Sequence, residues 1–101
     1  MQLVQILLPL YDNVGRRFGE EPYTQVRREL SERFGGLTAF TRAPAHGLWK
    51  SEGKTHRDDI VVFEVMTPEL DRAWWRHYRK RLETLFRQEK IIIRARDVEI
   101  L

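Results

Sequence analysis

An irregular segment near the middle of the chain holds the side chains best suited to chemistry. It reads RAPAHGLWKSEGKTHRDD, residues 42–59, and it joins two runs, LTAFT and IVVFEVM, that are both typical of strands. Glu52 and Gly53 suit the centre of a tight turn, so the residues on either side can pair as a two-stranded arm. In that register Trp49 lies opposite His56.

A Trp and a His that face each other on an arm can close over a small aromatic or anionic ligand, and Arg42 or Arg57 nearby can clamp an anion. In the alternative interpretation, Trp49 packs against its own sheet or a partner subunit, and His56 is a solvated edge residue. The candidate ligand-binding residues are Tyr11, Phe40, Arg42, Trp49, His56 and Glu64.

Glu64 and the adjacent pair Asp58 and Asp59 are candidate groups for acid/base chemistry. Glu64 lies inside an apolar run, where burying an unpaired carboxylate is costly. It could act as a general base, or it could pair with Arg42 or Arg94 across the sheet, and the pairing is favoured. Asp58 and Asp59 are neighbours in a strand, so their side chains point to opposite faces and cannot share one site.

The sequence gives little support for a metal, cofactor or nucleophilic site. His46 and His56 are ten residues apart and have no third ligand at a recognised spacing, so we expect no metal. The chain has no Cys, which removes thiolate catalysis and disulfides. No phosphate loop, dinucleotide fingerprint or nucleophile elbow is present. We expect no cofactor; the catalytic residues stay unknown, and whether the protein is an enzyme stays open.

The 101 residues, with a net charge of +3, predict one domain over 1–101. The apolar N-terminus lacks a basic region and is too short to span a bilayer, so it is interpreted as a strand. We therefore expect a cytoplasmic protein with no membrane partner.

Apolar periodicity and turn residues predict the elements that position these side chains. Strands are expected at 2–10, 37–41 and 60–66, and a last one at 91–93 continuing to Val98 and Ile100. Helices are expected at 21–34 and from Thr67-Pro68-Glu69 to about Glu89. The predicted inner face of the second helix, flanked by Trp75 and Phe86, consists of Leu70, Trp74, Tyr78, Leu82 and Leu85.

This order, β-α-β-β-α-β, predicts an α+β protein with a ferredoxin-like fold. It would have one four-stranded antiparallel sheet, two helices on one face of that sheet, and an extended hairpin arm between the second and third strands. Both central strands are apolar on both faces, yet the helices cover only one. A second subunit is the expected cover, so we predict a homodimer.

Sheet-to-sheet dimers of this topology are called dimeric α+β barrels, and the chain resembles that family in element order. The stretches RFGGLTAF, GLWK and RDDIVVFEV are also similar to small bacterial proteins of unknown function. The barrel resemblance implies that a cofactor-free oxygenase or isomerase, working with few polar groups in an apolar cavity, is one alternative.

The second helix raises a further alternative, because its basic residues and the Trp74-Trp75 pair suit phosphate contact and base stacking. Acidic residues on the same helix, and the position of its aromatic residues on the apolar stripe, favour a solvated face with helical ion pairs instead. The best-supported function is a homodimeric small-molecule-binding protein with its cavity between sheet and arm. The alternative is a protein-interaction or nucleic-acid-binding module.

Overall fold

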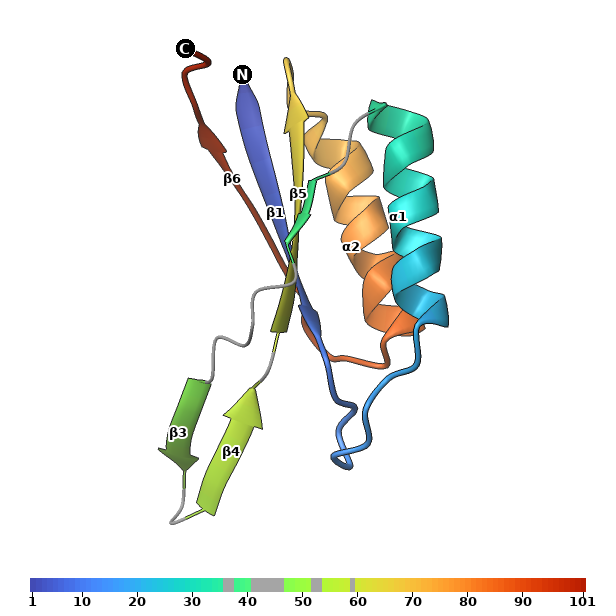
Figure 1. The fold of residues 1–101 in the computed structure, drawn as a ribbon, viewed down its shortest axis with the longest axis vertical. Coiled ribbons are helices and arrows are strands. Elements are labelled where there is room, and N and C mark those ends of the chain that lie inside the picture. The colour runs from blue at the N-terminus through green and yellow to red at the C-terminus, as the bar shows by residue number, and fades with distance from the viewer. Residues whose placement is uncertain (36–37, 41–46, 52–53, 59) are drawn as a thin grey trace.

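The described residues of the chain form two helices and six strands (Figure 1). A computed structural model describes residues 1–35 and 60–101 with their side chains, and 38–40, 47–51 and 54–58 as backbone. In chain order the elements are β1 (Gln2–Pro9), α1 (Glu21–Phe34), β2 (Thr38–Phe40), β3 (Gly47–Ser51), β4 (Lys54–Asp58), β5 (Ile60–Thr67), α2 (Arg72–Leu85) and β6 (Ile92–Asp97).

The sheet differs from the predicted one. Its three long strands are antiparallel in the order β5-β1-β6, and the three-residue β2 adds only a short edge beside β5. Strands β3 and β4 form a second, separate two-stranded sheet, here called the arm. The prediction of a ferredoxin-like βαββαβ chain with one regular four-stranded sheet is therefore wrong. The α+β class holds, and both helices lie on one face of the main sheet (Figure 1).

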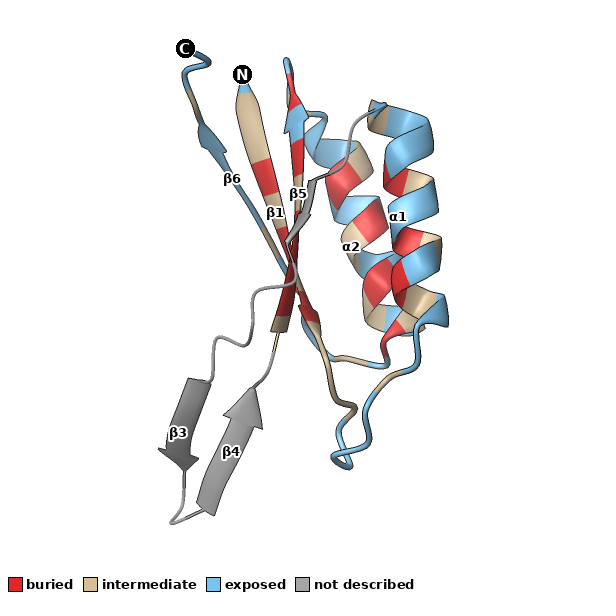
Figure 2. Ribbon diagram, in the orientation of Figure 1, coloured by how far each residue is buried: buried red, intermediate tan, exposed pale blue. Residues whose placement is uncertain are grey.

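The core lies between the main sheet and the two helices (Figure 2). Alternate residues of β1, namely Val4, Ile6 and Leu8, are fully buried there, and Phe63 of β5 joins them. Successive side chains of a strand point to opposite faces, so this alternation fixes which half of each strand faces the helices.

Helix α1 begins and ends where its sequence predicts. Pro22 occupies the first turn, where its missing N–H is no loss, and Gly35 closes the helix in a left-handed conformation with φ 73°. Its buried residues Tyr23, Val26 and Leu30 follow the predicted apolar stripe. The Tyr23 hydroxyl donates a hydrogen bond of 2.5 Å to the Pro9 carbonyl, which ties the helix to the end of β1.

Helix α2 begins later than predicted, at Arg72. Thr67 is the last residue of β5, and its hydroxyl donates to the Glu69 carbonyl instead of capping the helix. Asp71 is the N-cap, and its carboxylate accepts a hydrogen bond of 3.1 Å from the Trp74 N–H. The helix also ends early, at Leu85 and not near residue 89.

The inner face of α2 is rotated relative to the prediction. Trp75 is buried at 6% exposure and Trp74 is only half-buried, whereas the sequence pattern placed Trp74 inside. Phe86, predicted as a flank, is fully buried and lies 5.3 Å from Tyr23 between ring centroids. Tyr78 and Leu82 are buried as predicted.

The last strand also differs from its prediction. It runs without a break from Ile92 to Asp97 and includes Arg94 and Arg96, whereas the apolar pattern placed it at 91–93 and at Val98 and Ile100. An edge strand can carry charged residues because solvent reaches one side of it.

Replacing Trp75 with Ala should lower the free energy of unfolding by about 3–5 kcal/mol, because the lost ring leaves a cavity in the core. The matched Trp74→Ala variant should cost less, about 1–2 kcal/mol, since that ring is half-exposed and loses mainly aromatic contacts. Urea unfolding followed by circular dichroism measures both. A larger loss for Trp74 than for Trp75 would contradict this inner face.

Candidate functional site

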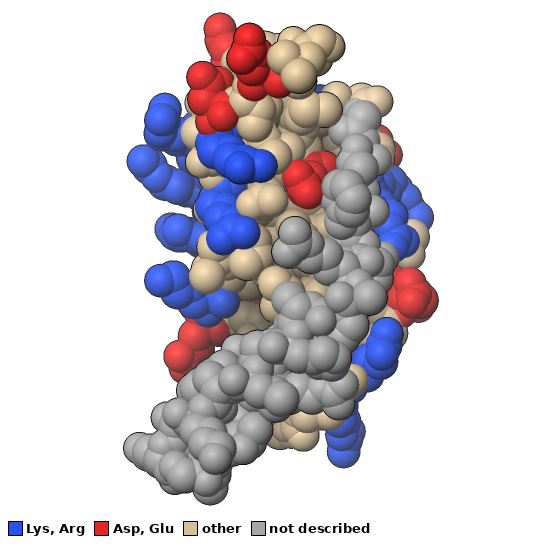
Figure 3. All heavy atoms as spheres, turned by 60° about the vertical axis from the view of Figure 1, so that its left-hand side comes forward, with Lys and Arg blue, Asp and Glu red and all other residues tan. Residues whose placement is uncertain are grey.

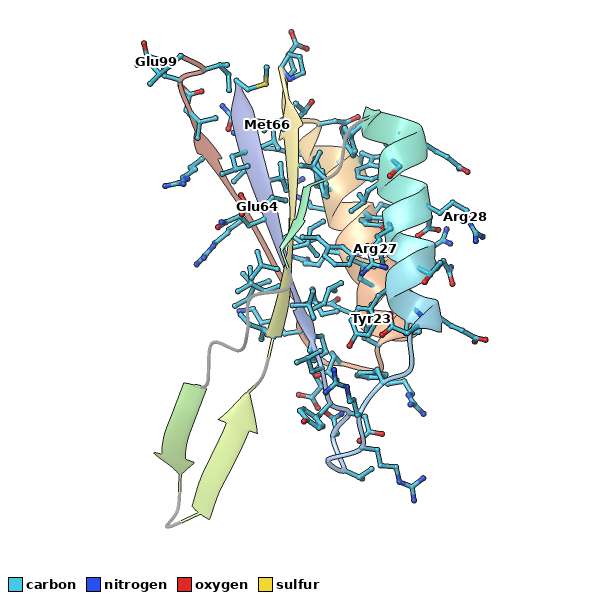
Figure 4. All side chains as sticks on the ribbon, viewed as in Figure 1. Tyr23, Arg27, Arg28, Glu64, Met66 and Glu99 are labelled. Carbon is cyan, nitrogen blue, oxygen red and sulfur yellow. The ribbon has the colours of Figure 1, made fainter. Side chains whose placement is uncertain are left out.

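The face of the main sheet that points away from the helices, here called the open face, is the candidate site. It carries the residues that alternate with the core positions, and Figure 4 shows Glu64 on this side. Its apolar members include Leu3, Leu7 and Ile92, and Ile92 is 49% exposed. Val62 is buried on this face but does not belong to the core cluster between sheet and helices.

Strand register arranges the open face in three rows that cross β5, β1 and β6 in that order. Register partners lie side by side and share a face of the sheet. The rows are Val62-Leu7-Ile92, Glu64-Gln5-Arg94 and Met66-Leu3-Arg96. The open face thus has an apolar row, then a polar row with opposite charges at its two ends, and then a mixed row.

The polar row has one internal contact. Arg94 Nε donates a hydrogen bond of 2.8 Å to Gln5 Oε1. The Glu64–Arg94 pair expected from the sequence is not formed, because Gln5 lies between the two strands that carry these residues. Among the residues with described side chains, none forms a hydrogen bond or ion pair with Glu64. Arg42, the other expected partner, lies outside the described residues.

The backbone of the arm agrees with the register predicted from its turn. Trp49 is the strand partner of His56, and Ser51 is the partner of Lys54. Figure 1 shows the arm extending beyond the end of the main sheet on the side away from the helices. Phe40 of β2 is the register partner of Val62, so its backbone lies at the edge of the apolar row.

Tyr11 lies in the turn that follows β1, where it forms a bridge with Arg17. In the same turn the Asp12 carboxylate accepts hydrogen bonds from the N–H groups of Arg16 and Val14, at 2.8 and 3.0 Å. The bond from Arg16 is the main cause that lowers the pKa of Asp12.

The six candidate residues are only partly brought together. Glu64 is level with Gln5 in the sheet, and six residues of extended chain, roughly 20 Å, separate Gln5 from Tyr11. Phe40 lies one row from Glu64, and Trp49 and His56 lie together on the arm. No single small pocket within the main sheet holds both Tyr11 and Glu64.

Gln5 was not among the candidates, although it accepts the hydrogen bond that orients Arg94. The available signal was its polarity, since it interrupts the apolar run LVQILL of β1. A polar residue at a central position of an apolar strand indicates a polar contact on one face.

Comparisons with known proteins assign the chain to no family: no family model matches it, and no curated protein matches it. Within the described ranges, neither helix is long and apolar enough to cross a membrane. In that same part of the chain, no three His, Asp or Glu side chains are grouped so that they could hold a metal ion.

Removing the arm should leave the main domain folded. Gly47 and Asp58 are register partners at the base of the arm, so a two-residue turn can join them in place of residues 48–57. Strands β3 and β4 contact each other and make few contacts with any other helix or strand. We expect the urea midpoint of the main transition to change little.

The control keeps the arm but carries Trp49→Ala and His56→Ala. If the arm serves recognition, both variants should fold, and both should lose ligand binding or weaken association, as measured by ligand titration and sedimentation. Failure of the shortened chain to fold would show that the arm is structural.

Proposed function

We propose that the protein is a homodimer, paired through the open face of its sheet, that binds a small organic ligand between that face and the arm. The observation that carries the proposal is the open face itself, where apolar residues and a charge pattern lie on the side that the helices leave uncovered. No reaction is part of the proposal, and the expected cytoplasmic location belongs to it.

The apolar row supports association. Leu7 lies at its centre, and Ile92 exposes about half of its surface to water (49%). Met66, in the mixed row, is 50% exposed. Grouped apolar side chains on a sheet face gain free energy, roughly 25 cal/mol per Å², when a second surface removes them from water.

The polar row selects the symmetry of the pair. Two sheets that face each other can be related by a two-fold axis that runs between them, parallel to β1. Each row then lies over the same row of the second copy, with its β5 end over the β6 end of that row. Glu64 then faces Arg94 of the second copy, and the half-exposed Ile92 lies over β5 of the second copy at the level of Val62, which is buried within its own chain. Both charges and apolar groups are matched in this arrangement.

A two-fold axis that runs between the sheets perpendicular to the strands matches the charges less well. When this axis passes through the polar row, it places Glu64 against Glu64 and Arg94 against Arg94, and like charges facing each other in an interface cost several kcal/mol. The charge pattern therefore favours sheets that pack with their β1 strands pointing the same way.

The ligand is proposed to lie near the apolar row, toward the arm. Phe40 and Val62 are partners at that edge, and Trp49 and His56 are partners on the arm. An aromatic and an imidazole side chain can enclose a small planar or anionic molecule. A thermal-shift screen of small metabolites, repeated on the arm-deleted chain, tests this part of the proposal.

A nucleic-acid role for α2 is less well supported, because the aromatic side chains needed for stacking are engaged. Trp75 and Tyr78 are buried, and Arg33 covers the Trp74 ring at 4.4 Å from its centroid. The Tyr78 hydroxyl donates to the Glu29 carboxylate, and burial, together with Glu29, raises its pKa. Base stacking requires free ring faces.

Charge reversal tests the dimer. Glu64→Arg alone and Arg94→Glu alone should each weaken association by about tenfold or more, because each puts like charges together at two symmetric places. The double variant Glu64→Arg/Arg94→Glu should recover most of the affinity, since it exchanges the two charges. Sedimentation equilibrium over a range of protein concentrations measures the dissociation constant.

The matched control is Arg28→Glu, on the solvent side of α1, where Figure 4 shows Arg28 pointing away from the sheet. It should leave association unchanged. A chain that stays monomeric at every concentration would contradict the dimer. A dimer that tolerates both single reversals would show that another surface mediates association.

A further inference from the structure

A second cavity lies on the other side of the sheet, between α2 and β6. Its volume is about 280 Å³. Val4 and Ile93 contribute to it from the strands, and Leu70 and Trp75 contribute from the α2 side. These side chains belong to the core or pack against it, so the floor of the cavity is apolar and lies opposite the open face.

The rim of this cavity is strongly basic. Arg72, Arg76 and Arg79 line it at spacings of four and three residues, so they share one face of α2. Among the residues with described side chains, no acidic residue lines the cavity. Figure 3 shows Lys and Arg side chains gathered along one long edge of the molecule.

Arg72 and Arg76 differ from the arginines near the other flank of α2. There, Arg81 pairs with Glu29, and Arg33 lies 3.7 Å from Asp71. Within the described part of the chain, Arg72 and Arg76 form no ion pair or hydrogen bond. Their charges therefore add to a positive potential in the cavity that no neighbouring carboxylate cancels.

Arg79 also lies at this rim, and its side chain is 43% exposed. Its Nε is buried and has no hydrogen-bond partner among the described residues. The nearest carboxylate, Glu83 Oε2, is 4.0 Å away and already accepts a hydrogen bond of 3.0 Å from the Ile91 N–H. Because this Nε is out of reach of solvent, an anion in the cavity would bind through the exposed part of the Arg79 side chain.

We infer that this cavity binds a small organic anion, with a carboxylate or phosphate group held by Arg72, Arg76 and Arg79 and an apolar part seated over Trp75, Leu70 and Ile93. Guanidinium groups can donate paired hydrogen bonds to the oxygens of a carboxylate or phosphate. The apolar floor adds selectivity for a molecule with a hydrophobic end. This site lies on the helix side of the sheet, and Arg94 is the one residue of the polar row that also contributes to its lining.

The test uses the full chain and three probes: phenylacetate, its uncharged analogue phenylacetamide, and inorganic phosphate. Isothermal titration at low ionic strength should show phenylacetate binding at least about tenfold more tightly than either of the others, because only phenylacetate uses both the arginines and the apolar floor. Equal binding of phenylacetamide would overturn the role of the arginines. Equal binding of phosphate would overturn the role of the floor, and no binding of phenylacetate would overturn the site.

The variant Arg76→Gln/Arg79→Gln should weaken phenylacetate binding at least about tenfold, while the matched Arg28→Gln variant on α1 should leave it unchanged. Urea unfolding of each variant establishes that the fold is kept. Equal losses in both variants would mean that net charge alone holds the anion and would overturn the site. Tighter binding of a short single-stranded oligonucleotide, lost in the same double variant, would assign the surface to nucleic acid and overturn the proposal.

Discussion

The alternation along β1 is the constraint on which the rest of the structure depends. Val4, Ile6 and Leu8 are fully buried against the helices, and this choice sends Leu3, Gln5 and Leu7 to the opposite face. Because β1 lies between β5 and β6, the same choice sets the faces of both neighbours through their register. A slip of one residue would place Gln5 in the core and expose Ile6. The core, the open face and the cavity beside α2 therefore all follow from one strand.

Local signals predicted those parts of the fold that local interactions decide. Helix α1 has Pro22 in its first turn and Gly35 as its C-cap, and both predicted limits were correct because each of these residues suits the backbone at one end of a helix. The arm register was correct for the same reason, since a two-residue turn fixes the pairing of Trp49 with His56. Where two signals competed, sequence alone could not choose. Thr67 can cap a helix or end a strand, and the longer ladder of β5 opposite β1 decided for the strand.

The errors in the sheet and in α2 arise from tertiary packing. Trp74 and Trp75 are adjacent and both lie near the apolar stripe, so periodicity cannot tell which ring enters the core; the answer depends on the rotation of α2 against the sheet. Strand β6 was misplaced because its charged residues break the apolar pattern, although pairing with β1 supplies its hydrogen bonds. For the candidate site, the sequence correctly placed Glu64 in a strand and paired Trp49 with His56 on the arm, while their role in binding stays a prediction. It missed Gln5, whose role depends on Arg94 of another strand, and it missed the α2–β6 cavity, which is assembled from distant segments.

Strand β6 belongs to both candidate binding surfaces. Ile92 and Arg96 lie on the open face, Ile93 and Ala95 line the cavity under α2, and Arg94 of the open face also contributes to the lining of the cavity. It is an edge strand, paired only with β1 among the described strands, so its position can adjust more easily than that of a central strand. Covering the open face with a second copy would order β6 from one side, and filling the cavity would order it from the other. Since the two events would order the same backbone, each would reduce the entropy lost in the other, and the architecture favours positive coupling between association and anion binding.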